Sequence, residues 1–319
     1  MSAESASPAD LPLSEGVRIL EDHPSGLVAL FKPPGVLSQP NPPEEPLPEA
    51  VRKAREAQPV DLDPIAPQRP SLLQAEYDFD EECFFWDEGG EERRLYLLNR
   101  LDSPTTGVVL LSRRESLVMA VRDIFASHRV QKTYYAIVKG RPPNMPPLWI
   151  DVLERKRTGE GHLRVQSSSQ AQSVARTRHQ FVRQDRNRLG ISLVRLSPVT
   201  GRTHQLRVQC AKRKVPIVGD QTYGDFKFNR RVSKGIYSKR MFLHAAALEL
   251  RLQHEGEVID FKAECPLPED FSLLLDSHPE LWVKDGAPGA PNTARSSSSR
   301  SASHGTSAAA SRQRSRRRP

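Results

Sequence analysis

Leu98-Asn99-Arg100-Leu101-Asp102-Ser103-Pro104-Thr105-Thr106-Gly107 is the most informative segment of this 319-residue chain. Apolar runs at 95–98 and 108–111 flank it, and together they predict a strand, a loop and a second strand. The loop carries one carboxylate, Asp102, two positions after Arg100. A short Arg-Leu-Asp sequence is also typical of an ordinary structural cap at a turn. The residues alone therefore leave the role of Asp102 open.

Apolar and β-branched runs on both sides of this segment predict many strands and a few short helices. The predicted strands are residues 17–20, 27–31, 134–138, 174–182, 191–196, 242–252 and 258–263. The predicted helices are residues 115–128, 204–212 and 269–275. Strands in runs with few interleaved helices indicate an α+β fold. We expect a mixed, largely antiparallel central sheet with flanking helices and loops.

Composition divides the chain into a folded part and two flexible ends. Residues 1–14 are polar and contain proline, so we expect a disordered N-terminus. Residues 15–283 are predicted to form one folded domain. Residues 284–319 contain mainly Gly, Ala, Pro, Ser and Arg, and such a segment cannot bury enough apolar area to fold. The sequence therefore predicts a disordered, basic Ser/Arg-rich tail.

The predicted domain contains an insertion rich in proline and acidic residues at about 39–92. The stretch 39–70 is expected to be irregular, apart from one possible short helix near 48–57. The aromatic group at 83–86 is expected to anchor the far end of the insertion to the domain.

The positive charge of the chain is concentrated in its central part. The net charge is +8, but residues 93–285 contain thirty-four basic and nineteen acidic residues, a local net charge of +15. Residues 41–92 contain fifteen acidic and four basic residues, and residues 286–319 contain seven arginines and no acid. A solvated surface explains an isolated charge run, but so much charge in one region favours a polyanion such as RNA as the partner.

Membrane, secreted and metal-binding classes have little support. No apolar run approaches the ~18 to 20 residues that span a bilayer, and the first residues lack the pattern of a secretory signal. Cys83, Cys210 and Cys265 lie far apart, with no C-x-x-C pair and no histidine at ligand spacing. We therefore expect a soluble, cytoplasmic monomer with neither a disulfide framework nor a bound metal.

Several motifs, in order along the chain, resemble those of the RluA-type pseudouridine synthases, which isomerise uridine in RNA. The segment after Asn99, R-L-D-x-x-T-T-G, resembles the family signature H-R-L-D-x-x-T-S-G. Residues 132–136 resemble K-x-Y-x-A, and residues 202–208, R-T-H-Q-L-R-V, match the segment that supplies an arginine in the family. Residues 31–35 and 216–224 are similar to its N-K-P-x-G and P-I-x-G-D-x-x-Y-G motifs. The likeness covers about residues 18–265 and implies the pseudouridine synthase fold.

The resemblance implies catalytic roles for three residues. Asp102 would attack or deprotonate the nucleoside after the target base is flipped, and Arg207 would pair with Asp102 and orient its carboxylate. Tyr134 would stack against the flipped uracil and help to remove its C5 proton. Breaking a C–N glycosidic bond gives the sugar positive character, which a nearby carboxylate can stabilise or trap. Taken singly, Arg207 is also compatible with a surface arginine, and Tyr134 with sheet packing.

Three further residues are implied in substrate binding. Arg100 matches the residue that fills the space left by the extruded base, which a planar guanidinium can do by stacking. Arg202 is expected to contact phosphate or to be structural. Leu243 matches an apolar residue of the uracil pocket, although a plain core position is the simpler interpretation of this leucine alone. His204 and His244 are expected to be hydrogen-bonding scaffold residues.

The chain departs from the family pattern at three positions. Asn99 and Gln209 stand where the family has histidine, and Thr106 stands where it has serine. None of these changes removes a catalytic group, but Asn99 is expected to alter how the loop is held.

Together, these features predict an RNA pseudouridine synthase. It would isomerise specific uridines in structured RNA, either rRNA or tRNA, by a catalytic aspartate and base flipping, without cofactor or metal. The first alternative is a catalytically silent RNA-binding protein that has kept the fold, which would bind RNA in a salt-sensitive manner and leave uridine unchanged. The second is a hydrolase with Asp102 as general base, which lacks a well-placed second carboxylate or metal set.

Overall fold

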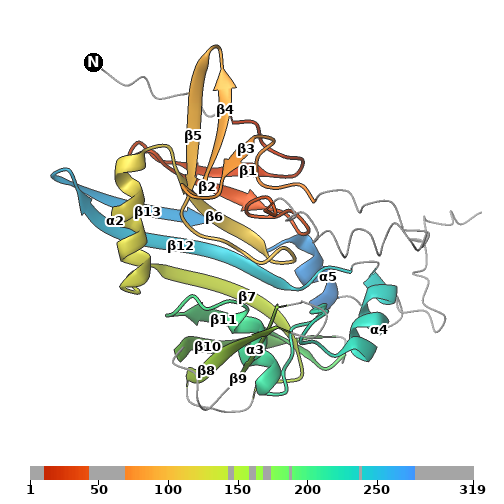
Figure 1. The fold of residues 1–319 in the computed structure, drawn as a ribbon. Helices are drawn as coiled ribbons and strands as arrows, with labels where there is room; N and C mark the ends of the chain where they lie inside the picture. Colours follow the sequence, from red (N-terminus) through yellow and green to blue (C-terminus); the bar gives the residue numbers. More distant parts are fainter. Residues whose placement is uncertain are drawn as a thin grey trace, which may run out of the picture. The chain divides into compact units, whose positions relative to one another are not determined.

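Thirteen strands and four helices make up the regular structure of the described residues (Figure 1). The computed structural model describes residues 11–42, 69–142, 147–157, 163–167, 174–186, 189–236 and 239–276. All of them belong to one unit, Met1–Pro288, whereas a second unit, Gly289–Pro319, lies outside the described residues. The predicted tail at 284–319 and the predicted helix near 48–57 also lie outside them.

The bounds of the elements follow chain order. The strands are β1 (Arg18–Asp22), β2 (Leu27–Lys32), β3 (Glu76–Asp78), β4 (Cys83–Glu88), β5 (Glu91–Leu97), β6 (Thr106–Ser112), β7 (Gln131–Lys139), β8 (Leu148–Arg157), β9 (Leu163–Ser167), β10 (Val174–Gln184), β11 (Ile191–Pro198), β12 (Leu243–His254) and β13 (Glu257–Glu264). The helices are α2 (Glu115–Ala126), α3 (Gln205–Lys212), α4 (Phe226–Ile236) and α5 (Glu269–Asp276).

The strands form one sheet in the order β3-β4-β5-β6-β12-β7-β11-β10-β8-β9. In addition, β13 pairs with β12, and β2 pairs with both β1 and β6. Every pair between these strands is antiparallel except β6 with β12. The predicted α+β fold with a mixed, largely antiparallel sheet is therefore confirmed.

The parallel pair between β6 and β12 joins two halves of the sheet. It is short, with Thr106 opposite His244 and Gly107 opposite Ala245. Gly107 has a φ of +116°, and a Cβ at this position would overlap the backbone of Ala245. A side chain here would be strained in its backbone and would also push the two strands apart. The glycine that ends the Asp102 segment is thus the residue that lets the halves meet.

Strand β6 is buried on both faces. On β6, Val108 and Leu110 pack into one apolar cluster, while Val109 and Leu111 pack into another on the opposite face. Both-sided burial explains why β6 is a continuous apolar run, without the alternation of a half-exposed strand. The predicted strand, loop and strand around Asp102 are β5, the intervening loop and β6.

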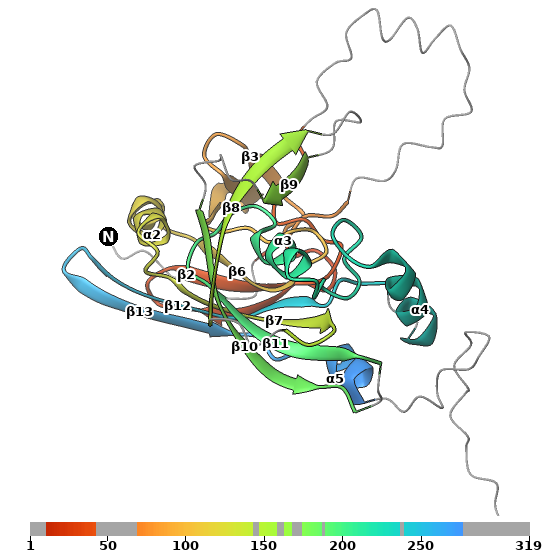
Figure 2. The ribbon, with the colours of Figure 1, turned by 90° about the horizontal axis from the view of Figure 1, so that it is seen from below.

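Helix α2 covers one face of the first half (Figures 1 and 2). Its buried positions include Leu117, Val121 and Ile124, which pack in the cluster containing β12 and β13 residues. The predicted helix, 115–128, is two residues too long because His128 adopts a left-handed conformation, with φ of +59°. The backbone N–H of His128 then donates to the carbonyl of Phe125 at 3.1 Å, which closes the helix end.

Two segments differ from the sequence prediction. Residues 11–14, assigned by composition to a disordered N-terminus, pack against residues 72–74: Leu11 is buried, and the Ser14 N–H donates to the Leu72 carbonyl at 3.0 Å. The far end of the predicted insertion belongs to the sheet as β3, β4 and the start of β5. Cys83 and Phe84 of β4 are fully buried in two different clusters, which agrees with the anchoring predicted for this aromatic group.

Helix α4 was not predicted. Its sequence is mainly polar and basic, and among the side chains of α4 that the structure describes only Phe228 and Val232 are buried, four positions apart on one side. The carboxylate of Asp225 accepts a hydrogen bond from the Phe228 N–H at 2.9 Å and so caps the first turn. None of the described helices has the length and apolar character needed to cross a membrane.

Candidate active site

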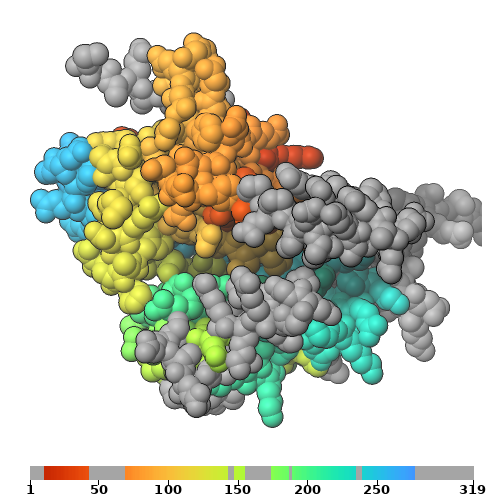
Figure 3. Space-filling view, in the orientation of Figure 1, coloured from red at the N-terminus to blue at the C-terminus, as the bar shows by residue number. Residues whose placement is uncertain are grey.

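A cavity of about 570 Å³ lies where four segments of the chain meet. These are residues 37–42, the Asp102 loop, β7, and the segment of residues 198–207 that leads into α3. This volume is in the usual range for a site that binds a small molecule or a single nucleotide. The space-filling view shows a groove between the orange and yellow part of the chain and the green part (Figure 3). The cavity thus lies between the two halves of the sheet.

The buried side chain of Lys32 holds the Asp102 loop through hydrogen bonds to backbone carbonyls. This lysine is fully buried, and its ammonium donates hydrogen bonds to the carbonyls of Val36 at 2.6 Å, Ser103 at 2.9 Å and Pro33 at 3.2 Å. Burial lowers the pKa of Lys32 from 10.5 to about 7, while the charge of Asp102 opposes that shift. Lys32 of the N-K-P-x-G-like motif therefore joins the turn at residues 33–36 to Ser103, the residue after Asp102.

Asn99 closes the other end of the loop. Its side-chain carbonyl accepts a hydrogen bond from the Leu110 N–H at 2.6 Å, so it ties the loop to β6. The Leu98 N–H also donates to the Leu110 carbonyl at 3.0 Å. Within the loop, the Thr105 N–H donates to the Asp102 carbonyl at 2.9 Å. Asn99 thus has a definite structural role at the position where the family has histidine.

Arg207 and Asp102 are in direct contact, as the resemblance implies. The Nη1 atom of Arg207 donates to Oδ2 of Asp102 at 2.9 Å, and the two residues are 105 positions apart in the chain. The side chain of Arg207 is 5% exposed, whereas that of Asp102 is 27% exposed toward the cavity. The surface interpretation of Arg207 is therefore wrong. A buried guanidinium holds the carboxylate and leaves part of it accessible to a substrate.

A second carboxylate, Asp220, fixes Arg207 from behind. Asp220 is 1% exposed and accepts hydrogen bonds from Nε of Arg207 at 2.8 Å and from Nη2 at 2.9 Å. It also accepts the N–H groups of Thr222 and Tyr223 at 2.8 and 3.0 Å. Burial acts to raise the pKa of Asp220, but these bonds and the charge of Arg207 outweigh it and lower the pKa. Burial likewise acts to lower the pKa of Arg207, yet the two aspartates raise it.

Sequence reasoning missed this role of Asp220. The residue stands in P-I-x-G-D, a motif noted only as support for the resemblance. The signal was the glycine before it: Gly219 has a φ of +81°, and a Cβ there would overlap the Arg240 carbonyl. A tight turn of this kind brings Asp220 into the interior, where a carboxylate needs a partner.

His204 begins α3 from a left-handed conformation, with φ of +52°. The Nδ1 atom of His204 lies 2.9 Å from the hydroxyl of Tyr223, and the Nε2 atom lies 3.9 Å from Oδ2 of Asp102. Left-handed conformations of residues other than glycine are strained and gather at functional sites. The scaffold role predicted for His204 agrees with its bond to Tyr223. His204 also lines the cavity, next to Asp102.

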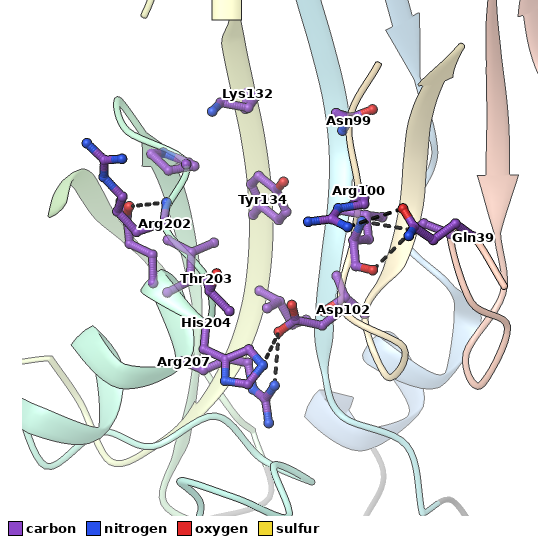
Figure 4. Close-up of a pocket in the computed structure, with 18 of the residues that line it drawn as sticks. Gln39, Asn99, Arg100, Asp102, Lys132, Tyr134, Arg202, Thr203, His204 and Arg207 are labelled. Atoms are coloured by element: carbon purple, nitrogen blue, oxygen red, sulfur yellow. Dashed lines mark hydrogen bonds and ion pairs between the residues drawn. The ribbon is translucent and has the colours of Figure 1, made fainter. Parts of the chain in front are cut away.

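Tyr134 lies on β7, between the Asp102 loop on one side and the Thr203–His204 segment on the other (Figure 4). Its ring packs against apolar residues of both halves of the sheet and lines the cavity. Burial, and secondly the negative charge of Asp102, raise the pKa of the Tyr134 phenol, so the phenol stays protonated at neutral pH. Tyr135 packs on the opposite face of the sheet, as predicted.

Leu243 also lines the cavity and is 3% exposed, so its cavity position and the core interpretation are both correct.

The two remaining arginines lie on the rim. Arg100 is exposed, and its Nη1 atom donates to the side chain of Gln39 at 3.2 Å. Arg202 is exposed on the opposite side of the cavity (Figure 4). No ion pair brings either of them to Asp102 within the described structure.

Lys132 stands two positions before Tyr134 on β7 and adds a fourth cation to the cavity wall, after Arg100, Arg202 and Arg207. Its ammonium lies 5.9 Å from the centroid of the Phe125 ring, and burial lowers its pKa. Asp102 is the only carboxylate among the described residues of the wall. A single acid in a cationic surround is suited to a substrate that carries negative charge.

The other family departures are buried and satisfied. The Oγ1 atom of Thr106 accepts from Nη2 of Arg240 at 2.6 Å and bonds Nδ1 of His244 at 2.9 Å. The Nε2 atom of His244 lies 3.1 Å from the carbonyl of Cys265. Burial lowers the pKa of His244 to about 4, so this ring is neutral, in agreement with a scaffold role. The side chain of Gln209 accepts from Thr177 at 2.6 Å and donates to Asp151 at 2.9 Å.

No group of three or more His, Cys, Asp or Glu side chains that could hold a metal ion occurs in the described part of the chain. The side chains of the cavity offer one oriented carboxylate, an aromatic face and cations on the rim. These groups can stack a planar base, act as nucleophile or base, and bind a phosphate backbone.

Comparisons with known proteins agree with this geometry. Residues 26–212 match the sequence profile of the family described as RNA pseudouridylate synthase. Ribosomal large subunit pseudouridine synthase C of Escherichia coli (strain K12) is 37% identical over 191 residues, which are 58% of this chain and 56% of that protein. tRNA pseudouridine synthase C of Yersinia pestis is 31% identical over 184 residues, 55% of this chain and 71% of that protein. The chain therefore spans little more than half the length of the first of these relatives.

A solved structure has a similar fold. Human RNA Pseudouridylate Synthase Domain Containing 1 superposes with a TM-score of 0.51 at 20% sequence identity. The match covers 86% of this chain and 92% of that chain, so the similarity extends across the whole fold.

Proposed function

Because the chain belongs to the RNA pseudouridylate synthase family, we propose that it is an enzyme that isomerises uridine in RNA to pseudouridine. One observation carries the proposal. Arg207 holds Asp102 at 2.9 Å, and both line the same cavity as the ring of Tyr134. Three side chains that are far apart in sequence therefore surround a space that suits a flipped base.

In the proposed reaction the target uridine leaves the RNA helix and its uracil stacks on Tyr134. The C–N glycosidic bond breaks, with the carboxylate of Asp102 attacking the sugar or removing a sugar proton. The detached uracil turns, and its C5 carbon bonds to the sugar as Asp102 is released or returns the sugar proton. C5 then loses its proton, and N1, which no longer bonds the sugar, takes up a proton. No atom is gained or lost overall. Arg207 keeps the Asp102 carboxylate oriented through these steps.

Other cavity residues have supporting roles in this proposal. Arg100 occupies the space that the extruded base leaves, Arg202 and Lys132 contact phosphates, and Leu243 packs against the uracil edge. The names of two relatives refer to ribosomal RNA and to tRNA. We therefore propose a structured RNA of one of these two classes as substrate.

The two alternative functions have less support. A silent RNA-binding protein has no need to retain an oriented carboxylate, yet Asp102, Tyr134 and Arg207 share one cavity. A hydrolase that cleaves with two carboxylates needs a second acid near the first. Asp102 is the sole acid in the described wall of the cavity, and Asp220 is turned away from it, onto Arg207.

The direct test is the Asp102→Asn variant. Asparagine keeps the size of the side chain but removes the charge, so we expect pseudouridine formation to be abolished while RNA affinity stays within a few-fold. Site-resolved mapping of pseudouridine in cells with and without the protein identifies the substrate. The mapped RNA then serves to compare wild type and variant in vitro. Full activity of Asp102→Asn would overturn the assignment.

A further inference from the structure

A second cavity, of about 560 Å³, lies beside α4. Its wall includes Phe226, Arg230 and Ser233 of α4, the Gly219 turn, and Lys239, Arg240 and Phe242, which directly precede β12. No residue lines both this cavity and the cavity of Asp102. Some of its lining residues nevertheless support the Asp102 site. Gly219 precedes Asp220, and Arg240 donates to Thr106 at 2.6 Å. The second cavity is therefore a separate site on the same framework.

The outer surface of α4 is strongly basic. The helix carries four cations and no acid, and Lys227, Arg230, Arg231 and Lys234 are all exposed. They form two pairs of like charge four positions apart, an arrangement that destabilises a helix. No ion pair in the described residues links any of them, or Lys239, to a carboxylate. The nearest acid in sequence, Asp225, already pairs with Lys139.

A polyanion would remove this repulsion. The exposed ring of Phe226, 56% accessible, stands at the first turn of α4 and belongs to the wall of the cavity. Basic side chains beside an accessible aromatic ring are the usual means of binding single-stranded nucleic acid, because the cations bind phosphates and the ring stacks a base. An acidic protein partner would not use the ring in this way.

Helix α4 is also rigidly connected to the Asp102 site. The side chain of Asn229 accepts from the Gly219 N–H at 2.9 Å and donates to the Asp220 carbonyl at 2.9 Å. Asp220 in turn holds Arg207, and Arg207 holds Asp102. On the inner side, Phe228 and Val232 are buried in the core. RNA bound on α4 would therefore be held in a fixed position relative to the catalytic carboxylate.

We propose that the cavity beside α4 is a second RNA-contact site, which binds an unpaired stretch of the substrate RNA away from the target uridine. Arg230 and Lys239 contact its phosphates, and Phe226 stacks one base. The inference rests on the proposed function. It adds a binding surface that lies outside the cavity of Asp102, and Figure 3 shows the teal atoms of α4 on the same face as the green atoms around α3.

The test compares two double variants of the full chain. Arg230→Gln with Lys239→Gln removes two cations of the α4 cavity. The matched control, Arg251→Gln with Lys262→Gln, removes two exposed cations from the β12–β13 hairpin, which lies at the opposite side of the molecule (Figures 1 and 2). All four side chains are exposed, so both proteins should fold with an unchanged melting temperature. Charges beyond about 10 Å are largely screened at moderate salt.

We expect the α4 variant to raise KM for RNA several-fold with kcat nearly unchanged. The salt dependence of its RNA affinity should weaken by about 1.4 in log–log slope, because each phosphate contact to a single strand contributes about 0.7. The exchange Arg230→Lys with Lys239→Arg should restore both values, and Phe226→Ala should raise KM without changing the slope. The hairpin control should match wild type in KM and slope.

The outcomes separate the two proposals. If wild type is active and the α4 variant has the KM and salt slope of wild type, the second site does not exist and the proposed function stands. An equal loss in the hairpin control would also refute the site, because the effect would then reflect net charge alone. If wild type binds RNA but forms no pseudouridine, the proposed function fails, and the slope measurement still decides whether α4 contacts RNA.

Discussion

Replacing Asp220 by asparagine should damage both stability and activity, although Asp220 does not line the cavity of Asp102. Its carboxylate is 1% exposed and accepts four hydrogen bonds, two of them from Arg207. Asparagine has the same shape but no charge, and it presents an N–H₂ group where one oxygen accepted a bond. Arg207, itself 5% exposed, would keep Asp102 as its only carboxylate partner in the described structure.

The size of the effect follows from burial. Removing one partner of a buried ion pair costs about 3 to 5 kcal/mol where the other charge is left without compensation. Asp102 still compensates Arg207 in part, so we expect a cost near the lower end of this range. A typical domain is stable by about 5 to 15 kcal/mol, so the variant should fold but with a small margin. Arg207 would also shift toward Asp102, and misplacement of a catalytic group by about 1 Å can lower the rate about 100-fold.

A matched control exists in the Arg183–Asp276 pair. It also has two hydrogen bonds, from Nη1 and Nη2 of Arg183 at 2.9 and 2.8 Å, but its side chains are 35% and 39% exposed. Solvent screens such a pair, so Asp276→Asn should cost at most about 1 kcal/mol. The two pairs differ in burial, and Asp220 also accepts two backbone N–H groups. The comparison therefore measures the cost of removing a buried rather than an exposed carboxylate partner of an arginine.

Urea unfolding as a function of pH tests whether the charged form of Asp220 stabilises the folded protein. The pKa of Asp220 is lowered in the folded protein, so its contribution to stability is present above the unfolded pKa of about 3.9. That contribution is lost as the pH falls through the lower folded value. The difference in unfolding free energy between wild type and Asp220→Asn should therefore be constant near neutral pH and shrink below about pH 4. An Asp220→Asn protein that loses under about 1 kcal/mol and keeps the wild-type rate would refute the reasoning.

Two further predictions concern the framework of the loop. Gly107→Ala should prevent stable folding or lower the melting temperature severely, because Gly107 has a φ of +116° and the new Cβ would overlap the Ala245 carbonyl. A melting temperature close to that of wild type would show that β6 and β12 can separate without loss of stability. Lys32 has a pKa lowered from 10.5 to about 7, so the folded state disfavours its proton and the free energy of unfolding should rise as the pH increases from 7 toward 10.5. Lys32→Met should lack this rise in urea titrations, and an identical pH profile in both proteins would contradict the assignment.

The elements that could be predicted from the sequence are those with a strong apolar pattern. Strands β2, β6 and β12 are continuous or alternating apolar runs, and α2 has apolar residues at helical spacing. Helix α4 could not be found in this way because only two of its described side chains, Phe228 and Val232, are buried. In strand β4, the acidic surroundings suggested an insertion, whereas the fully buried Cys83 and Phe84 join it to the sheet.

The functional residues divide along a similar line. Asp102, Tyr134 and Arg207 stand in motifs, so the resemblance could name them, and the structure brings all three to one cavity. Asp220 and Lys32 act through burial: one accepts four hydrogen bonds in the interior, and the other donates to three carbonyls beneath the loop. A sequence does not distinguish a buried aspartate or lysine from a surface one. Their roles became visible only when the contacts were known.

The segment from Leu98 to Gly107 has two functions that can be separated by experiment. Gly107 lets β6 approach β12, so it determines where the halves of the sheet meet. Asp102, five positions earlier, then faces Arg207 and β7 across that same junction. The cavity exists because two half-sheets are joined through a short parallel contact, with the carboxylate on one side and its guanidinium partner on the other. Asp102→Asn should therefore lose activity with little loss of stability, whereas Gly107→Ala should lose the fold first. If both variants lost activity and stability in proportion, the loop would be one structural unit, and the assignment of Asp102 to chemistry would lose its strongest argument.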